Sequence, residues 1–184
     1  MKATEQLRNE HEGIKLMMHI LWKLSGKLEA GEEVDPEHLE KIIEFFRVFA
    51  DKCHHGKEED LLFPALEAVG IPREGGPIGA MLLEHDKGRG FMKGMAGAVA
   101  KYKGGDPKAA PVIASNARNY IALLTEHIEK ENAVLFPMAD SRLSAEEQES
   151  MFEEFEKIEV EKIGVGKHEE FHQLLDNLSA IYLK

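Results

Sequence analysis

The chain has 184 residues, 43% of them hydrophobic, which is enough for one domain with a substantial core. Its formal net charge of −11 argues against a nucleic-acid or anionic membrane partner. One cysteine, Cys53, excludes an internal disulfide and is typical of a reducing compartment. The polar N-terminus lacks a signal-peptide core, and no apolar stretch is long enough to span a membrane. We therefore expect a cytoplasmic protein.

Apolar residues recur at helical spacing along nearly the whole chain, without the alternation of strands. The expected helices cover residues 4–30, 36 to beyond 58, 79–102 and 110–139, then one that opens near 144 and a last one over 167–183. Four long helices joined by short turns predict an all-α, up-down-up-down four-helix bundle. We expect this bundle to occupy residues 1–142, with residues 143–184 forming a C-terminal helical extension packed on the same domain.

One sequence phrase occurs twice. His54 to Pro64 reads H-H-G-K-E-E-D-L-L-F-P, and His127 to Pro137 reads H-I-E-K-E-N-A-V-L-F-P. Both copies share a histidine, a glutamate four residues later and a following Leu-Phe-Pro. Upstream, Glu10-His11-Glu12 matches Glu84-His85-Asp86 at nearly the same offset. The repetition indicates a duplicated helical pair that builds one symmetric metal site.

The spacing explains why these residue types point to metal binding. Residues four apart share one helix face, so each repeated histidine and its glutamate can hold the same ion. Imidazole and carboxylate ligands together favour iron over calcium or magnesium, and structural zinc sites favour cysteine. We expect two non-haem iron ions, each with two histidines, bridged by the glutamates and an oxo or hydroxo group. The predicted ligands are His11, His54, Glu58, His85, His127 and Glu131.

Other residues near the motif have plainer interpretations. A single His-x-x-x-Glu is usually a surface pair, and only its repetition favours metal binding. Leu-Phe-Pro reads as an apolar turn that plugs the bundle end and breaks the helix. We expect His55 to point about 100° away from His54 and to stay outside the site. The acidic neighbours are expected to be solvated or to support the ligands from outside: Glu10, Glu59, Glu84 and Glu129.

His168 and His172 form an ambiguous pair on the last helix. They are the polar face of a helix whose Phe171 turns inward, or one of them supplies an additional imidazole to the metal site. The second possibility arises because Arg89 lies four residues after His85, so that helix offers only one ligand.

The motifs resemble those of the hemerythrin-like, or HHE cation-binding, family over about residues 7–138. The matching segments are N-E-H-E-G, H-H-x-K-E-E-D-x-L-F-P, G-G-P-x-x-x-M-L-x-E-H-D-x-G-R and E-H-I-x-x-E-N-x-x-L-F-P. The resemblance implies a four-helix bundle with a di-iron centre held by the six predicted ligands. Members of this family bind dioxygen, sense oxygen or redox state, handle nitric oxide or peroxide, or assist iron–sulfur repair.

Two departures place the chain within that family. Invertebrate oxygen carriers have a second histidine where this chain has Arg89, and their last carboxylate follows its histidine by five residues, whereas Glu131 follows His127 by four. The bacterial and archaeal di-iron branch is the closer match. Its iron–sulfur repair members usually carry an additional cysteine-bearing N-terminal domain, and its absence here weakens a dedicated repair role.

The expected function is binding of dioxygen or a related ligand, nitric oxide or peroxide, for storage, sensing or detoxification, with an electron donor as a possible partner. The alternatives are a di-iron oxidoreductase that turns over peroxide or nitric oxide, and an iron-handling or iron–sulfur repair protein, so whether the protein is an enzyme stays open. Helical phase suggests an apolar pocket lined by Met18, Trp22, Phe49, Met81 and Ile128.

Overall fold

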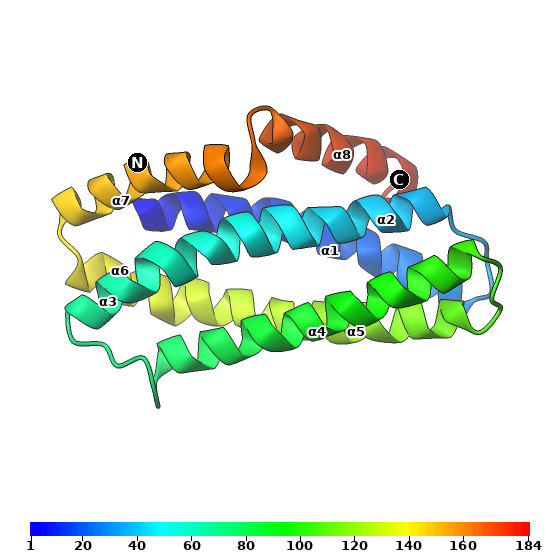
Figure 1. Cartoon of the computed structure of the whole chain (residues 1–184), viewed down its shortest axis with the longest axis horizontal. Helices are drawn as coiled ribbons and strands as arrows, with labels where there is room; N and C mark the ends of the chain where they lie inside the picture. The colour runs from blue at the N-terminus through cyan, green and yellow to red at the C-terminus, as the bar shows by residue number, and fades with distance from the viewer.

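The computed structural model describes residues 1–184 and is entirely helical, with no strand (Figure 1). Four long helical rods form the bundle. They are α1 (Ala3–Glu29); α2 (Pro36–Phe45) continued by η1 (Phe46–His55), η2 (Glu58–Leu62) and α3 (Phe63–Ala68); α4 (Pro77–Lys103); and α5 (Ala109–Lys130) continued by η3 (Glu131–Leu135) and α6 (Phe136–Arg142). The η segments are π-helical, a form that is frequent at functional sites. Consecutive rods run in opposite directions, which confirms the predicted helical bundle.

Local sequence signals explain several helix boundaries. The Asp35 side chain accepts a hydrogen bond from the Glu37 amide at 2.9 Å, and Pro36 occupies the first turn. Ser144 and Glu147 form the capping box that opens α7 (Ala145–Ile158). At the ends of α1 and α4, Gly31 and Gly105 adopt positive φ angles of 76° and 89°, which glycine tolerates without steric cost. No helix is both long enough and apolar enough to cross a membrane.

The Leu-Phe-Pro motifs do not break the helices as the sequence had suggested. Each motif follows a π turn, in which the amide of Phe63 bonds to the carbonyl of Glu58 and that of Phe136 to the carbonyl of Glu131. Proline at the next position has no N–H to donate, and it lies in the first turn of the α-helix that follows. The widened turn therefore absorbs the proline, and each rod continues past it.

Two apolar clusters fill the bundle, and the predicted ligands lie between them. One contains Ile14, Phe46 and Leu124, while the other contains Leu7, Leu62 and Leu135. Along each bundle rod, the chain passes from one cluster to the other through one or more of the predicted ligands. The polar residues thus form a layer that interrupts an otherwise apolar core. The leucine and phenylalanine of each Leu-Phe-Pro motif are buried in the second of these clusters, as expected, whereas Pro64 and Pro137 are exposed.

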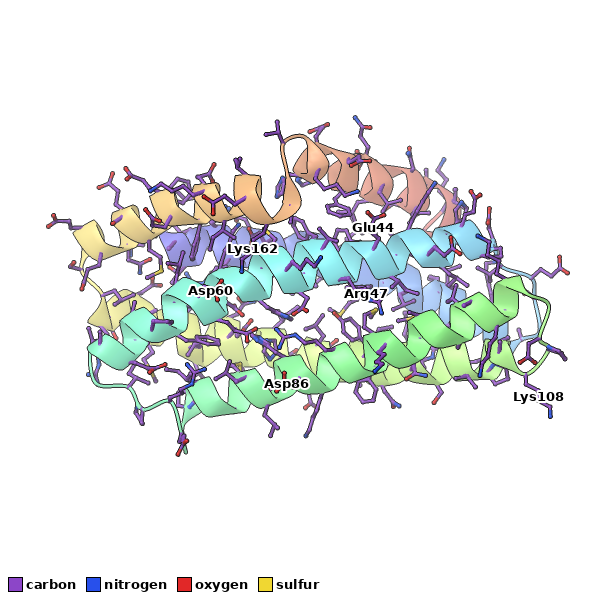
Figure 2. The ribbon with its side chains drawn as sticks, in the orientation of Figure 1. Glu44, Arg47, Asp60, Asp86, Lys108 and Lys162 are labelled. Atoms are coloured by element: carbon purple, nitrogen blue, oxygen red, sulfur yellow. The ribbon has the colours of Figure 1, made fainter.

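The C-terminal extension lies along the bundle side formed by α1 and α2. It comprises α7, η4 (Glu159–Ile163) and α8 (Lys167–Tyr182), which follow one another in the same direction (Figure 1). Ion pairs join it to the second rod: Lys162 contacts Asp60 at 2.5 Å (Figure 2), and Lys167 contacts Glu44 at 2.8 Å. Phe171 of α8 faces the bundle and is buried, as predicted for the last helix.

Candidate metal centre

The structure brings all six predicted ligands into the bundle interior. None is more than 2% exposed, although all six are polar or charged. They come from all four rods of the bundle: His11 from α1, His54 and Glu58 from the second rod, His85 from α4, and His127 and Glu131 from the fourth rod. Their donor atoms fall into two groups, and within each group the atoms lie within 4.8 Å of one another. The groups are His11, His54, Glu58 and Glu131, and His55, Glu58, His85 and His127.

Two glutamates connect these groups. The oxygens of Glu58 lie 3.4 Å from His54 Nε2 and 3.3 Å from His85 Nε2. Those of Glu131 lie 3.0 Å from His11 Nε2 and 2.9 Å from His127 Nε2. Each carboxylate therefore faces one histidine of each group with a different oxygen. This is the arrangement of a carboxylate that bridges two metal positions.

Six of the central polar atoms fit a metal site because they have no other partner, whereas Nε2 of His85 and Nε2 of His127 lie 3.1 Å from each other. His11 Nε2, His54 Nε2 and both oxygens of Glu58 and Glu131 are buried and have no hydrogen-bond partner. Their approaches are close, but the angles are not those of hydrogen bonds. Buried polar atoms without partners are costly and rare, so six at one point require an explanation. Cations coordinated between the two groups satisfy all of them.

The outward-facing nitrogen of every histidine has a partner. Nδ1 of His54 contacts Glu10 at 2.7 Å, that of His127 contacts Glu84 at 3.1 Å, and that of His85 contacts Glu59 at 3.2 Å. His11 Nδ1 lies 2.9 Å from the side-chain oxygen of Asn132. A proton held on Nδ1 leaves the Nε2 lone pair free for a metal. Three of the four acidic neighbours thus support ligands, whereas Glu129 is exposed.

Mutual attraction shifts the ionisation of these buried groups. Burial alone lowers the pKa of His54, but the charge of Glu58 and the hydrogen bond to Glu10 outweigh it and raise the pKa to about 10. His85 likewise has its pKa raised to about 9, against the effect of burial, by Glu58 and Glu59. Burial raises the pKa of the Glu58 carboxyl, yet His54 and His85 hold it well below its ordinary value. In the metal-free site the carboxylates are therefore ionised and these two imidazoles are protonated, so a bound cation would displace protons from Nε2 of His54 and His85.

His55 is the residue that sequence reasoning misplaced. It is 5% exposed, its ring stacks on that of His85 with centroids 3.8 Å apart, and it belongs to the second group. Its Nδ1 contacts Asp51 at 3.2 Å, so it too presents Nε2. The missed signal is spacing: Glu58 follows His54 by four residues and His55 by three, and both spacings place side chains on the same helix face.

The alternative ligands on the last helix do not reach the site. His168 is half-buried with its ring 5.3 Å from that of Phe49, His172 is exposed, and neither belongs to the two groups. Arg89, four residues after His85, forms ion pairs with Asp51 and Glu59. The additional imidazole near His85 comes from His55 instead.

The two halves of the site differ in their surroundings. Lys57 and Lys130 are equivalent in the repeat, and their ammonium groups contact Glu10 and Glu84 respectively. Lys57 is fully buried because η4 covers it, and it also contacts Glu159 at 2.6 Å. Lys130 is exposed. The extension therefore covers the half of the site that contains His54, and it does not cover the half that contains His127.

A cavity of about 110 Å³ opens beside the second group. His55, His85 and His127 contribute to its wall. The expected apolar pocket is wrong in location, because none of its five residues lines this cavity. Met18, Trp22 and Ile128 instead line a separate surface groove, whereas Phe49 and Met81 are packed in the two cores.

An all-helical bundle with paired His and Glu ligands between two cores defines a metal-binding protein. The comparison with protein families is consistent with that class: the hemerythrin HHE cation binding domain matches residues 2–139. The chain belongs to this family.

Similar proteins occur in mycobacteria. The chain is 26% identical over 179 residues to an uncharacterized protein of Mycobacterium tuberculosis H37Rv, and to uncharacterized proteins of M. tuberculosis CDC 1551 and Mycobacterium bovis. Each alignment covers 97% of this chain and 68% of the relative. Because the alignments extend past residue 139, the similarity includes most of the C-terminal extension. No solved structure matches the chain.

Proposed function

We propose that the protein holds two non-haem iron ions and binds dioxygen or a related small ligand, nitric oxide or peroxide, for storage, sensing or detoxification. The observation that carries this proposal is the pair of buried His and Glu groups joined through Glu58 and Glu131. One position would be held by His11 and His54, the other by His55, His85 and His127, with the glutamates shared. Mixed imidazole and carboxylate ligation favours iron.

The iron pair would supply reducing electrons and coordination positions for a small ligand. The protein's own residues hold the imidazoles in one orientation through their Nδ1 partners, and they exclude bulk water through the apolar clusters on either side. Glu10 and Glu84 perform the same task in the two halves, each fixing the histidine of the following rod.

A second candidate is an oxidoreductase that turns over peroxide or nitric oxide. The cavity beside the second group favours a reaction with an external small molecule. A repair or iron-handling protein is a further alternative within the same family.

Anaerobic iron loading tests the proposal. Elemental analysis is expected to find two irons per chain, and glutamine in place of Glu58 or Glu131 is expected to lose most of that iron. Rapid mixing of the reduced protein with dioxygen distinguishes the candidates. A stable, reversible optical change supports binding, and a signal that decays while peroxide or nitric oxide is consumed supports an oxidoreductase. Full iron retention in both glutamine variants would refute the ligand assignment.

A further inference from the structure

The five histidines around the two metal positions differ in the partner of their outward-facing nitrogen. His11 is the exception among them, because its Nδ1 lies 2.9 Å from the side-chain amide oxygen of Asn132. In the other four, Nδ1 contacts a carboxylate: His54 contacts Glu10, His55 contacts Asp51, His85 contacts Glu59, and His127 contacts Glu84. With a metal at Nε2, the proton of His11 lies on Nδ1, which donates it in a hydrogen bond to the Asn132 oxygen. Only this histidine is therefore held by an uncharged group.

The repeat shows which charge differs between the two halves. Asn132 and Glu59 each come directly after the glutamate of their copy of the motif. Each contacts the upstream histidine of the other copy, Asn132 that of α1 and Glu59 that of α4. An amide oxygen and a carboxylate oxygen accept the same hydrogen bond, but only the carboxylate is charged. At this position the two halves are therefore alike in connectivity and differ by one negative charge.

The charge of this partner matters for a metal ion that changes its oxidation state. A carboxylate that accepts the Nδ1 hydrogen bond makes the imidazole a more basic ligand. Its charge also acts directly on the ion, and more strongly in the buried interior than in water. Both effects favour the ion with the higher positive charge, and an amide oxygen provides both more weakly. The position that His11 holds therefore favours the ferrous state, relative to the position that His85 holds.

The remaining charges of the first half do not replace the missing carboxylate. Glu10, the partner of His54, is in contact with the fully buried ammonium of Lys57, and the partly exposed Glu159 also contacts that lysine. Arg8, on α1, is paired with Asp140 at 3.1 Å. The one carboxylate behind the histidines of this half is therefore neutralised at contact distance.

The second half keeps more of its negative charge. Its three histidines have three carboxylate partners: Asp51, Glu59 and Glu84. The cations that pair with these carboxylates, Arg89 and Lys130, have side chains that are 39% and 46% exposed, so water screens them. Two further exposed groups near this half have opposite charges and offset each other: Arg47 and Asp86. The surroundings of the second position are therefore the more negative.

We propose that Asn132 sets the reduction potential of the metal position held by His11 and His54, so that an electron delivered to the oxidised pair reduces the iron at that position first. The step transfers one electron from an external one-electron donor to one ferric ion, and it breaks no bond in the chain. Asn132 touches a ligand and not the metal, so it is a positioning residue. This inference rests on the proposed iron pair and deepens it, because it assigns unequal roles to the two ions.

Asn132→Asp tests the proposal, because aspartate has nearly the same size and accepts the same hydrogen bond. We expect this variant to keep two irons and to shift the ferric-to-ferrous affinity ratio of the first position about tenfold toward ferric, which lowers the first reduction potential by about 59 mV. Spectroelectrochemical titration at about pH 8, where an introduced carboxylate is ionised, measures the shift. Asn119→Asp, which adds the same charge at an exposed site on α5, is the matched control and is expected to leave both potentials unchanged. If Asn132 only holds the His11 ring in place, aspartate does so equally well, and an unchanged potential would overturn the proposal.

The reverse exchange tests the assignment of the two positions. Glu59→Gln removes the negative charge behind His85, and it is expected to raise the second reduction potential by a similar amount while the first stays nearly unchanged. Mössbauer spectra of the half-reduced parent protein are expected to show one ferrous and one ferric ion. If Asn132→Asp and Glu59→Gln shift the same potential, the two residues do not act on separate positions and the proposal fails. A parent protein that binds no iron would refute the proposed function together with this inference, whereas a two-iron parent in which Asn132→Asp behaves like Asn119→Asp would refute this inference only.

Discussion

At the scale of single residues, adjacent histidines serve the two halves of the site. His54 faces His11 across one group, and His55 stacks on His85 in the other. Both lie within one helical turn before Glu58, which touches both groups. Asp51 contacts His55 and is itself held by Arg89, so this arginine on α4 helps to fix the orientation of the His55 ring. Asp51 is accordingly ionised, because His55 and Arg89 overcome the effect of burial and lower its pKa to about 2.

Replacing His55 by alanine tests this arrangement. We expect His55→Ala to weaken the second metal position by about 10- to 100-fold or more, the range found when even supporting groups of metal sites are removed. Metal analysis after dialysis is expected to find close to one iron per chain, with the first position retained. His168→Ala, on the extension, is expected to keep two. A His55→Ala protein that retains both ions with unchanged affinity would show that His55 only stacks on the ligand His85.

At the scale of helices, the two copies of the motif share one construction. In each, the glutamate of the His-x-x-x-Glu motif begins a π turn and the proline follows six residues later. The carbonyl of that glutamate accepts the i→i−5 bond, so its backbone is fixed by the turn that accommodates the proline. Leu-Phe-Pro thus contributes to the position of the carboxylate as well as to the core.

The extension adds a third element to one half. Lys57 lies between Glu10, which orients His54, and Glu159 of η4. Burial lowers the pKa of Lys57, but Glu10 and its other neighbours raise it above the ordinary value, so the buried ammonium stays charged. The chain Glu159–Lys57–Glu10–His54 therefore connects the C-terminal extension to a predicted ligand.

Methionine substitutions at the two equivalent lysines measure this connection. Lys57→Met leaves Glu10 buried without its cation, and such a change costs about 3 kcal/mol or more. Lys130→Met removes an exposed ion pair, whose contribution is about 0–1 kcal/mol. Denaturant unfolding of the iron-loaded proteins checks the difference, and iron content is expected to fall only in Lys57→Met. Equal free energies of unfolding for the two variants would contradict a role for the extension at the site.

The sequence predicted the helices, their caps and the clustering of six side chains, because apolar periodicity and the repeated His-x-x-x-Glu are local and strong. It failed where the outcome depends on helix phase or on neighbours from distant segments. The position of the His55 ring depends on its spacing to Glu58 within a π-helical region, and the residue pattern does not predict π-helix there. The apolar pocket was misplaced because phase alone does not tell which face of a four-helix bundle is left unfilled. The sequence also predicted that Pro64 breaks its helix, but the π turn before it accommodates the proline and the helix continues.

At the scale of the whole molecule, the polar layer divides the core in two. An uninterrupted apolar core would stabilise the bundle more, because burying carboxylates and imidazoles without full bonding is unfavourable. The fold retains this layer at the cost of stability in the absence of metal. The cost falls on the bundle centre, where all four rods meet, and so it affects every helix.

Metal removal is therefore expected to destabilise the entire protein. Ions present at about 1,000 times their dissociation constant would stabilise the folded state by about 4 kcal/mol, which for a chain of this size corresponds to a Tm about 10 °C higher. Scanning calorimetry of chelator-treated and iron-reloaded protein measures this shift, and hydrogen exchange is expected to show lost protection first in η2 and η3. Glu58→Gln, which lacks one of the two carboxylates that face both groups, is expected to show a much smaller difference between the two states. Identical Tm values for the metal-free and reloaded parent protein would mean that the buried polar layer is stable by itself, and that the unpartnered atoms of Glu58 and Glu131 do not require cations.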